Sequence, residues 1–254
     1  MKKIRAKKNL GQHFLDDLQI AQQISDLIKS DNNPNILEVG PGTGALTQFL
    51  VKKTNNIKCV EIDHDCILLL KKQFYEISNN IIEGDFLKLN LQKIFRNPYI
   101  IIGNFPYNIS TQILFHILEY KDLVHQIIGM FQKEVAERLV SKKGKNRGVL
   151  TILMEAFYDS EYCFTVNEDV FIPPPKIKTG VIKFTRNNRK KLECNTSLFL
   201  NIIKSAFNQK RKTLRNALKS FSLDKQSIEH LLQKRAEELS VDDFIKITFH
   251  AQKI

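Results

Sequence analysis

Short apolar runs rich in Ile and Val recur through the first half of this sequence, and an amphipathic stretch of helical length follows most of them. The apolar runs predict five buried strands, at residues 35–39, 57–62, 80–83, 99–102 and 125–131. The amphipathic stretches predict four helices, at about 17–29, 44–52, 65–74 and 110–118, the first capped by Asp16. Strands without a polar face must be covered on both sides. The pattern therefore predicts an α/β fold, a Rossmann-like parallel sheet with helices on both faces.

The pattern changes after Phe184. Residues 186–191 are polar and basic and predict a linker, and the apolar residues that follow recur at helical spacing as far as Ile247. We therefore expect two domains, a sheet domain at 1–186 and a small all-helical domain at 187–254. Pro173–Pro175 forbids a helix and predicts a stiff extended segment at the edge of the sheet.

The chain carries a net charge of +12, and the surplus lies in two segments. Residues 1–15 hold five bases and no acid, and residues 186–219 hold ten bases and one acid. Two basic patches on a nearly neutral body are typical of a protein whose partner is a polyanion such as a nucleic acid. We expect no membrane partner, because no apolar run reaches the ~18–20 residues of a membrane span.

The sequence also indicates the compartment. The start of the chain has no apolar core of a secretory signal, and the four cysteines form no C-x-x-C pair. Both observations favour a reduced, cytoplasmic protein without a disulfide framework or a zinc site, and we expect a monomer.

Three ligand-binding signals follow the first three predicted strands. Gly40, Gly42 and Gly44 form a G-x-G-x-G loop after the first, Glu61 ends the second, and Asp85 follows the third. Because the carboxyl ends of parallel strands meet at one edge, these groups face the same crevice. The glycines allow close approach to a ligand, Glu61 can accept hydrogen bonds from ribose hydroxyls, and Asp85 can accept one from an adenine amine. Without the G-x-G-x-x-G spacing of a dinucleotide site, the trio indicates S-adenosylmethionine (SAM) rather than NAD.

The motif Asn104-Phe-Pro-Tyr107 follows the fourth strand. An exocyclic adenine amine is a weak nucleophile because the ring delocalises its lone pair. Acceptors that hold both N–H bonds help it to attack, and the Asn104 side-chain oxygen and the carbonyl of Phe105 or Pro106 can be those acceptors. Pro106 stiffens the loop, and Tyr107 offers a ring on which a base can stack. The motif therefore predicts methyl transfer to a base amine, by in-line displacement that depends on positioning.

Other chemistries have no support in the sequence. The six histidines show no metal-ligand spacing, and there is neither a phosphate-binding G-x-x-x-x-G-K-[ST] loop nor a G-x-S-x-G elbow. We therefore expect no metal, no nucleotide hydrolysis and no serine-hydrolase activity.

With these residues in hand, the sequence resembles the KsgA family of ribosomal RNA adenine dimethyltransferases. Eight segments carry the resemblance in family order: 9–15, 37–47, 60–63, 84–85, 104–111, 132–138, 171–176 and 207–216. It implies four methyl transfers from SAM, two to each of two neighbouring adenines near the 3′ end of small-subunit rRNA. The partner implied is the immature small ribosomal subunit.

The resemblance also implies roles for individual residues. The SAM contacts would be His13, Leu15, Gly40, Glu61, Asp85 and Asn104. The acceptor site would be Asn104, Pro106 and Tyr107. The contacts to RNA phosphates would be Lys7, Lys8, Lys210, Arg211, Lys212 and Arg215, so that 1–186 is catalytic and 187–254 binds RNA. Three positions depart from the family pattern: His13 replaces Asn, Phe105 replaces Leu, and Arg147 replaces an aromatic residue.

Three alternatives remain open at this point. A large-subunit rRNA methyltransferase that confers antibiotic resistance shares the glycine loop and N-x-P-Y, but the segments at 11–15, 173–176 and 210–216 favour the small-subunit enzyme. A ribosome-assembly or transcription-associated protein without activity would not need Glu61, Asp85 and the motif at 104–107. A nicotinamide dehydrogenase is disfavoured by both motifs.

Overall fold

The computed structural model describes residues 4–29 and 33–253, and it divides into two compact units. The first unit holds the chain up to Ala136 together with Ser160–Arg186, and the second holds Glu137–Asp159 and the chain from Asn187 onward. Two of the five bases predicted for the N-terminal patch, Lys2 and Lys3, lie outside the described residues.

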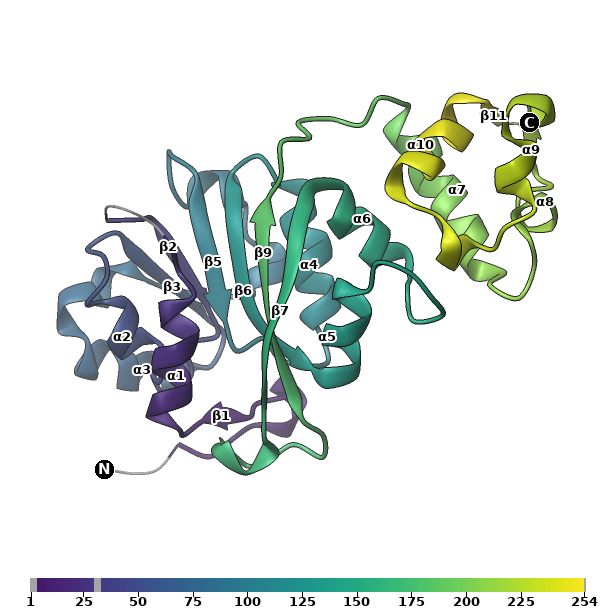
Figure 1. Ribbon diagram of the computed structural model, residues 1–254. Helices are drawn as coiled ribbons and strands as arrows, with labels where there is room; N and C mark the ends of the chain where they lie inside the picture. The colour runs from purple at the N-terminus through teal and green to yellow at the C-terminus, as the bar shows by residue number, and fades with distance from the viewer. Residues whose placement is uncertain (1–3, 30–32, 254) are drawn as a thin grey trace. The chain divides into compact units, whose positions relative to one another are not determined.

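Seven strands form the main sheet, in the order β4–β3–β2–β5–β6–β9–β7 (Figure 1). Their bounds are β2 Ile36–Val39, β3 Ile57–Glu61, β4 Ile81–Glu83, β5 Tyr99–Gly103, β6 Val124–Gln132, β7 Tyr158–Val166 and β9 Thr179–Arg186. Strands β2 to β6 are parallel, and β9 runs antiparallel to β6. Because β2 lies between β3 and β5, the order of strands reverses there, and this is where open α/β sheets bind ligands.

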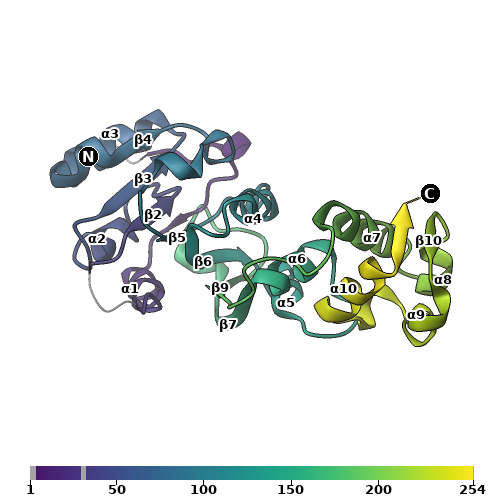
Figure 2. The same cartoon turned by 90° about the horizontal axis from the view of Figure 1, so that it is seen from above.

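Helices cover both faces of this sheet, as predicted. Helices α1 (Leu18–Asp26), α2 (Thr47–Leu50) and α3 (His64–Gln73) share one apolar cluster with alternate strand residues such as Ile100 and Ile102. Helix α4 (Ser110–Glu119) lies on the opposite side from α1 and α2 (Figure 2). Helix α5 (Lys133–Val140) follows β6 directly.

A separate two-stranded sheet ties the N-terminal segment to the region after β7. Strand β1 (Phe14–Leu15) pairs antiparallel with β8 (Phe171–Ile172), with Phe14 opposite Ile172. The proline segment that begins at Pro173 continues directly from β8. This pairing carries residues 9–14 to the carboxyl ends of the parallel strands.

The second unit is mainly helical. Its helices are α6 Val149–Phe157, α7 Thr196–Asn208, α8 Leu214–Ala217, α9 Lys225–Leu232 and α10 Val241–Phe249. Asn195 caps α7 by accepting a hydrogen bond from the Leu198 N–H, and Ser240 caps α10 in the same way. The structure adds a small sheet that the sequence analysis did not predict, in which β10 (Phe221–Leu223) pairs with β11 (Ala251–Lys253).

Strands β7 and β9 were not predicted, and the main sheet is not wholly parallel as expected, because β9 runs antiparallel to β6. The predicted helix and domain boundaries differ from the structure in three further respects. Asp17, not Asp16, caps α1, since its Oδ1 accepts the N–H groups of Gln19 at 2.8 Å and Ile20 at 3.0 Å. Helix α2 is shorter than predicted because the glycine loop extends to Gly44, whose φ is +87°. The segment Glu137–Asp159 belongs to the second unit, because α6 packs against α7 and α10.

No helix within residues 4–29 and 33–253 combines the length and the apolar character that a membrane crossing requires.

Candidate active site

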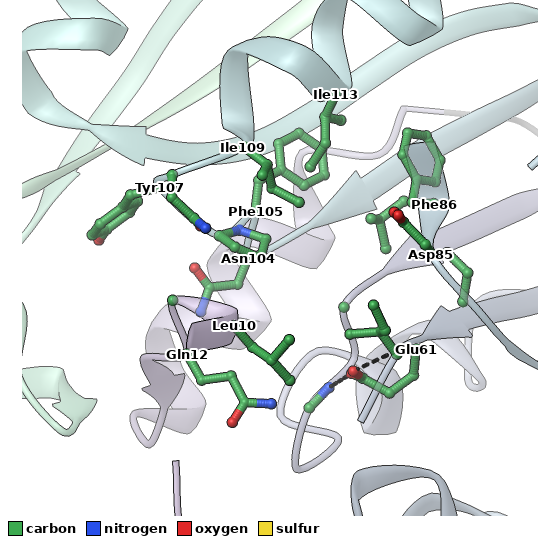
Figure 3. Close-up of a pocket in the computed structure, with 18 of the residues that line it drawn as sticks. Leu10, Gln12, Glu61, Asp85, Phe86, Asn104, Phe105, Tyr107, Ile109 and Ile113 are labelled. Atoms are coloured by element: carbon green, nitrogen blue, oxygen red, sulfur yellow. Dashed lines mark hydrogen bonds between the residues drawn. The ribbon is translucent and has the colours of Figure 1, made fainter. Parts of the chain in front are cut away.

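The carboxyl ends of β2, β3, β4 and β5 open into a cleft with a cavity volume of about 230 Å³. Of the predicted SAM and acceptor residues, all but Leu15 line it: His13, Gly40, Glu61, Asp85, Asn104, Pro106 and Tyr107. Figure 3 shows Asn104, Phe105 and Tyr107 on one side of the cleft, and Glu61, Asp85 and Phe86 on the other. The fold therefore brings together groups that lie up to about ninety residues apart in the chain.

The glycine loop passes close to the N-terminal segment. Gly40 and Gly42 both have positive φ, +68° and +56°. A Cβ at Gly42 would also lie 2.9 Å from the ring of Phe14. Both the backbone conformation and the close approach require glycine at position 42.

Glu61 is buried and holds the glycine loop in place. Its Oε2 accepts the Gly42 N–H at 3.0 Å, and its Oε1 accepts the N–H groups of Ile62 and Asp63 at 2.9 Å each. Burial raises the pKa of Glu61, and these three backbone hydrogen bonds oppose the rise. A carboxylate has about four acceptor positions, so Glu61 keeps capacity to accept a hydroxyl from a ligand in the cleft.

Asp85 lies at the start of a short 3₁₀ helix, Phe86–Lys88, that follows β4. Its Oδ1 accepts the Leu87 N–H at 3.0 Å, which orients the carboxylate beside the cleft. Phe86 is buried and Ile62 is half exposed, and both line the cleft with Asp85. A carboxylate flanked by apolar side chains suits a planar base that presents an amine donor.

The cleft has the charge that a sulfonium ligand requires. None of its lining residues, all within the described part of the chain, is Lys or Arg, whereas Glu61 and Asp85 are both acidic. A dinucleotide would place its pyrophosphate against groups of the wrong sign. A ligand with ribose hydroxyls, an adenine amine and one positive charge fits the same groups, so the residues present fit SAM.

Glu38, at the end of β2, is fully buried beside this site. Its Oε2 accepts the Thr47 hydroxyl at 2.8 Å and the thiol of Cys59 at 3.6 Å. Burial raises the pKa of Glu38 from 4.5 to about 7, although these two hydrogen bonds oppose the rise. The native chain therefore binds a proton at Glu38 between about pH 4.5 and 7 that the unfolded chain has lost.

Glu38→Gln is expected to change how stability depends on pH. The wild-type chain loses stability as the pH rises through this window because a buried carboxyl must ionise, whereas a glutamine does not titrate. Relative to the variant, the free energy of unfolding of the wild type should fall by roughly 3 kcal/mol from pH 4.5 to 8. Urea titrations at pH 4.5 and pH 8 measure it, and an equal difference between the two chains at both values would contradict the expectation.

The N-x-P-Y motif directly follows β5, and its amide has a defined orientation. Asn104 Nδ2 donates to the main-chain carbonyl of His13 at 2.7 Å. Its Oδ1 therefore remains as the acceptor of this side chain. The carbonyl of Pro106 accepts the Ile109 N–H at 3.1 Å and closes a turn. The sequence analysis considered the carbonyls of Phe105 and Pro106 as acceptors for the amine. Because the Pro106 carbonyl is used in this turn, the Phe105 carbonyl is the one that remains for a ligand.

Tyr107 is held from two sides. Its hydroxyl and that of the buried Thr179 are hydrogen-bonded to each other. The ring of His13 stacks on the Tyr107 ring, with centroids 5.7 Å apart and an interplanar angle of 26°. Nδ1 of His13 lies 2.7 Å from the Pro173 carbonyl, and this contact orients the histidine ring. No sequence pattern pointed to Thr179, which is 72 residues from Tyr107.

Two predicted residues occupy different surroundings. Leu15 is buried and lines a smaller cavity beside Glu38, Gly40 and Asn104 rather than the main cleft. Lys7 donates to Asp63 at 2.5 Å and to Asp65 at 2.7 Å, and these hydrogen bonds raise the pKa of Lys7. The ammonium of Lys7 thus pairs with acids of its own chain.

Asp63 fastens the N-terminal segment at the edge of the cleft. Besides Lys7, it accepts Nε2 of Gln12 at 2.7 Å. Burial alone would raise the pKa of Asp63, but the hydrogen bonds from Lys7 and Gln12 outweigh it and lower the pKa. The sequence analysis did not single out Asp63 or Gln12 as site residues.

Phe105, which departs from the family pattern, packs into space left by Gly129. The side chain is fully buried and packs edge-on against Phe131, with centroids 5.5 Å apart. A Cβ at Gly129 would lie 2.5 Å from the Phe105 ring. The larger ring is accommodated because β6 carries no side chain at that position.

The other predicted RNA contacts lie at two places. Lys8 is exposed near the N-terminus, and Arg211 and Lys212 are exposed after α7. Lys210 and Arg215 already have partners, since Lys210 Nζ donates to the Arg147 carbonyl at 2.7 Å and Arg215 forms an ion pair with Glu229. Their contacts with RNA stay a prediction.

Three features together define a SAM-dependent methyltransferase. They are the parallel strands with their reversal of order, the glycine loop, and the acidic cleft with acceptors for a nucleobase. The chain belongs to the ribosomal RNA adenine dimethylase family, whose model matches residues 3–253. Within the described residues, no three His, Cys, Asp or Glu side chains are grouped as a metal site would require.

Relatives of nearly the same length support this assignment. The chain is 51% identical over 250 residues to Ribosomal RNA small subunit methyltransferase A of Phocaeicola vulgatus, covering 96% of this chain and 89% of that protein. It is 50% identical over 252 residues to the protein of the same name from Cytophaga hutchinsonii, covering 98% of each.

Two solved structures share the fold over most of their length. A dimethyladenosine transferase from Plasmodium falciparum is 28% identical with a TM-score of 0.79, covering 92% of this chain and 96% of that one. The 23S rRNA methyltransferase ErmE has a TM-score of 0.75 at 19% identity, covering 93% and 98%, a likeness of fold alone.

Proposed function

We propose that this chain transfers methyl groups from SAM to the exocyclic amines of two neighbouring adenines near the 3′ end of small-subunit rRNA, two to each base. The orientation of Asn104 carries the proposal. Because its Nδ2 is committed to the His13 carbonyl, its Oδ1 is the atom available at the cleft to accept an N–H from a base. An acceptor at this position suits an amine nucleophile.

When bound, SAM supplies an electrophilic methyl group on a sulfonium centre. The chain's own groups orient the base. The Asn104 Oδ1 and the Phe105 carbonyl accept the two amine N–H bonds, which draws electron density toward the nitrogen as it becomes tetrahedral. Tyr107 stacks on the base, and stacking of this kind contributes about 1–3 kcal/mol per base. The base must leave its own helical stack to reach the cleft.

Thr179 acts in this proposal by positioning Tyr107. Thr179→Val removes the hydroxyl that holds the Tyr107 hydroxyl while keeping the shape of the side chain. We expect KM for the RNA substrate to rise about threefold to tenfold, which corresponds to the free energy of roughly one hydrogen bond. The Kd for SAM should not change. Thr179→Ser should restore wild-type KM. Steady-state methylation and calorimetric SAM titration measure both, and an equal effect of the two substitutions would contradict the role.

The proposed partner is small-subunit rRNA in an incompletely assembled ribosomal subunit. The two basic segments support an RNA partner because phosphate contacts come from exposed Lys and Arg. The names of the relatives, which specify the small subunit, support this substrate over large-subunit rRNA. We further propose a cytoplasmic monomer; all four cysteines are free thiols, which suits a reducing compartment.

Methyl transfer from tritiated SAM tests the function. Small subunits that lack the modification should acquire label that co-migrates with dimethyladenine after RNA digestion, and large subunits should acquire none. A parallel reaction on protein-free small-subunit rRNA shows whether the partly assembled particle is required. Label confined to large-subunit rRNA would overturn the proposal.

A further inference from the structure

The loop between α5 and α6 is a basic turn within the second unit (Figure 1). It carries exposed Lys142, Lys143 and Lys145, and residues 141–148 contain no acid. Gly144 has a φ of +99°, and its carbonyl accepts the Arg147 N–H at 3.1 Å, which closes the turn. These eight residues include no apolar side chain, so the only apolar groups they expose are the methylene chains of the lysines.

A buried arginine anchors this turn. Arg147 is fully buried, and its guanidinium donates to the main-chain carbonyl of Leu239 and to the carboxylate of Glu155. The Gly144 N–H donates to the Glu237 carbonyl at 3.3 Å. A buried charge with an ion-pair partner and a carbonyl acceptor holds one position, because moving it would leave the charge unpaired. The three lysines are therefore displayed from a fixed turn.

The turn lies against the basic segment that follows α7. Lys210 Nζ donates to the Arg147 carbonyl at 2.7 Å and lies 5.6 Å from the centroid of the Phe207 ring. Arg211 and Lys212, the next two residues, are exposed. The hydrogen bond thus places five exposed cations from two distant segments within a few residues of one contact: Lys142, Lys143, Lys145, Arg211 and Lys212.

Acidic groups do not neutralise these lysines. Among the described residues, Lys142, Lys143 and Lys145 form no ion pair. Of the acids that contact the anchor of the turn, Glu155 is already paired with Arg147. Glu237 is buried. The charge of the loop therefore faces solvent.

We propose that Lys142, Lys143 and Lys145 form a phosphate-binding surface for rRNA that is continuous with Arg211 and Lys212. The inference rests on the proposed function and adds a segment to it. Lysines without apolar neighbours bind the RNA backbone by charge and release of counterions, and they position the RNA without reading its sequence. A membrane surface would require exposed apolar side chains beside the charges, which the loop lacks.

The test compares two variants of the full chain that lose the same charge. One carries Lys142→Ala, Lys143→Ala and Lys145→Ala; the control carries Lys71→Ala, Lys72→Ala and Lys93→Ala, three exposed lysines of the first unit. Binding to unmodified small subunits is measured from 50 to 200 mM KCl. The loop variant should lower the slope of log K against log salt by about 2 and raise Kd at 50 mM by about tenfold or more. The control should match the wild type.

Three further measurements distinguish loss of RNA contacts from loss of folding or catalysis. The Kd for SAM and the thermal midpoint of the loop variant should equal those of the wild type, which excludes loss of folding. Its rate with saturating subunits should also be unchanged, because none of the three lysines lies in the cleft. A loop variant that binds the subunit with wild-type Kd and salt slope would overturn the inference, even if it bound an acidic protein less well. That result would leave the proposed function intact, since methylation by the wild type tests it separately.

Discussion

Replacing Asn104 with alanine is expected to lower kcat for methyl transfer by about 10²–10³-fold, the usual cost of removing one hydrogen-bonding group that stabilises a transition state. The substitution removes the Oδ1 that would accept an amine N–H. It also removes the Nδ2 bond to the His13 carbonyl, so the N-terminal segment loses one of its fastenings to the cleft. Single-turnover methylation with saturating SAM and subunit isolates the chemical step.

The matched variant is Asn104→Asp. An aspartate keeps an oxygen acceptor toward the base but cannot donate to the His13 carbonyl while ionised. It should therefore retain more activity than the alanine variant and bind SAM more weakly than the wild type. Equal kcat for alanine and aspartate would show that the side-chain oxygen is not the group that matters, and the acceptor role would fail.

Glu61→Gln is expected to raise the Kd for SAM by about 10²-fold. Both oxygens of Glu61 accept backbone N–H groups, Oε2 from Gly42 and Oε1 from Ile62 and Asp63. In either orientation of the glutamine amide, its NH₂ group would face a backbone N–H, and two donors cannot form a hydrogen bond with each other. An unsatisfied buried donor costs about 1–3 kcal/mol, and the ligand loses its ribose acceptor at the same time. Calorimetric titration with SAM measures the change.

Glu83→Gln is the matched control. Glu83 ends the neighbouring strand β4, is exposed, and lies 3.3 Å from His64 outside the cleft. The Glu83→Gln variant loses the same charge as Glu61→Gln, at the same edge of the sheet. We expect its SAM affinity to stay within twofold of the wild type. A comparable loss of affinity in both variants would mean that general electrostatics, rather than the contacts of Glu61, hold the ligand.

The strands were predictable because their sequences are apolar on both faces. Residues 99–102 are apolar throughout, and residues 57–62 place apolar side chains on both faces despite Lys58 and Glu61. Both runs therefore predict buried parallel strands, and β5 and β3 occupy those positions. Short elements were harder to predict. The pairing of β10 with β11 joins segments about thirty residues apart, and a three-residue strand carries no periodicity.

The residues of the cleft could be gathered from the sequence because parallel strands end at one edge. Glu61, Asp85 and Asn104 each follow or end a strand, so their convergence follows from topology. The partners that orient them could not be predicted. Thr179 reaches Tyr107, and His13 reaches Asn104, only because β9 and the N-terminal segment are packed there.

The sequence by itself determined the α/β class, the candidate groups that line the cleft and the presence of two basic segments, because each depends on local pattern and on the rule that parallel strands share an edge. Tertiary structure decided which of the cations are paired. Lys7 forms ion pairs with Asp63 and Asp65, and Lys210 donates a hydrogen bond to the Arg147 carbonyl. The lysines of the α5–α6 loop, in contrast, face solvent. A sequence counts charges, but whether a charge is available to RNA depends on the distance to its nearest partner, and folding sets that distance.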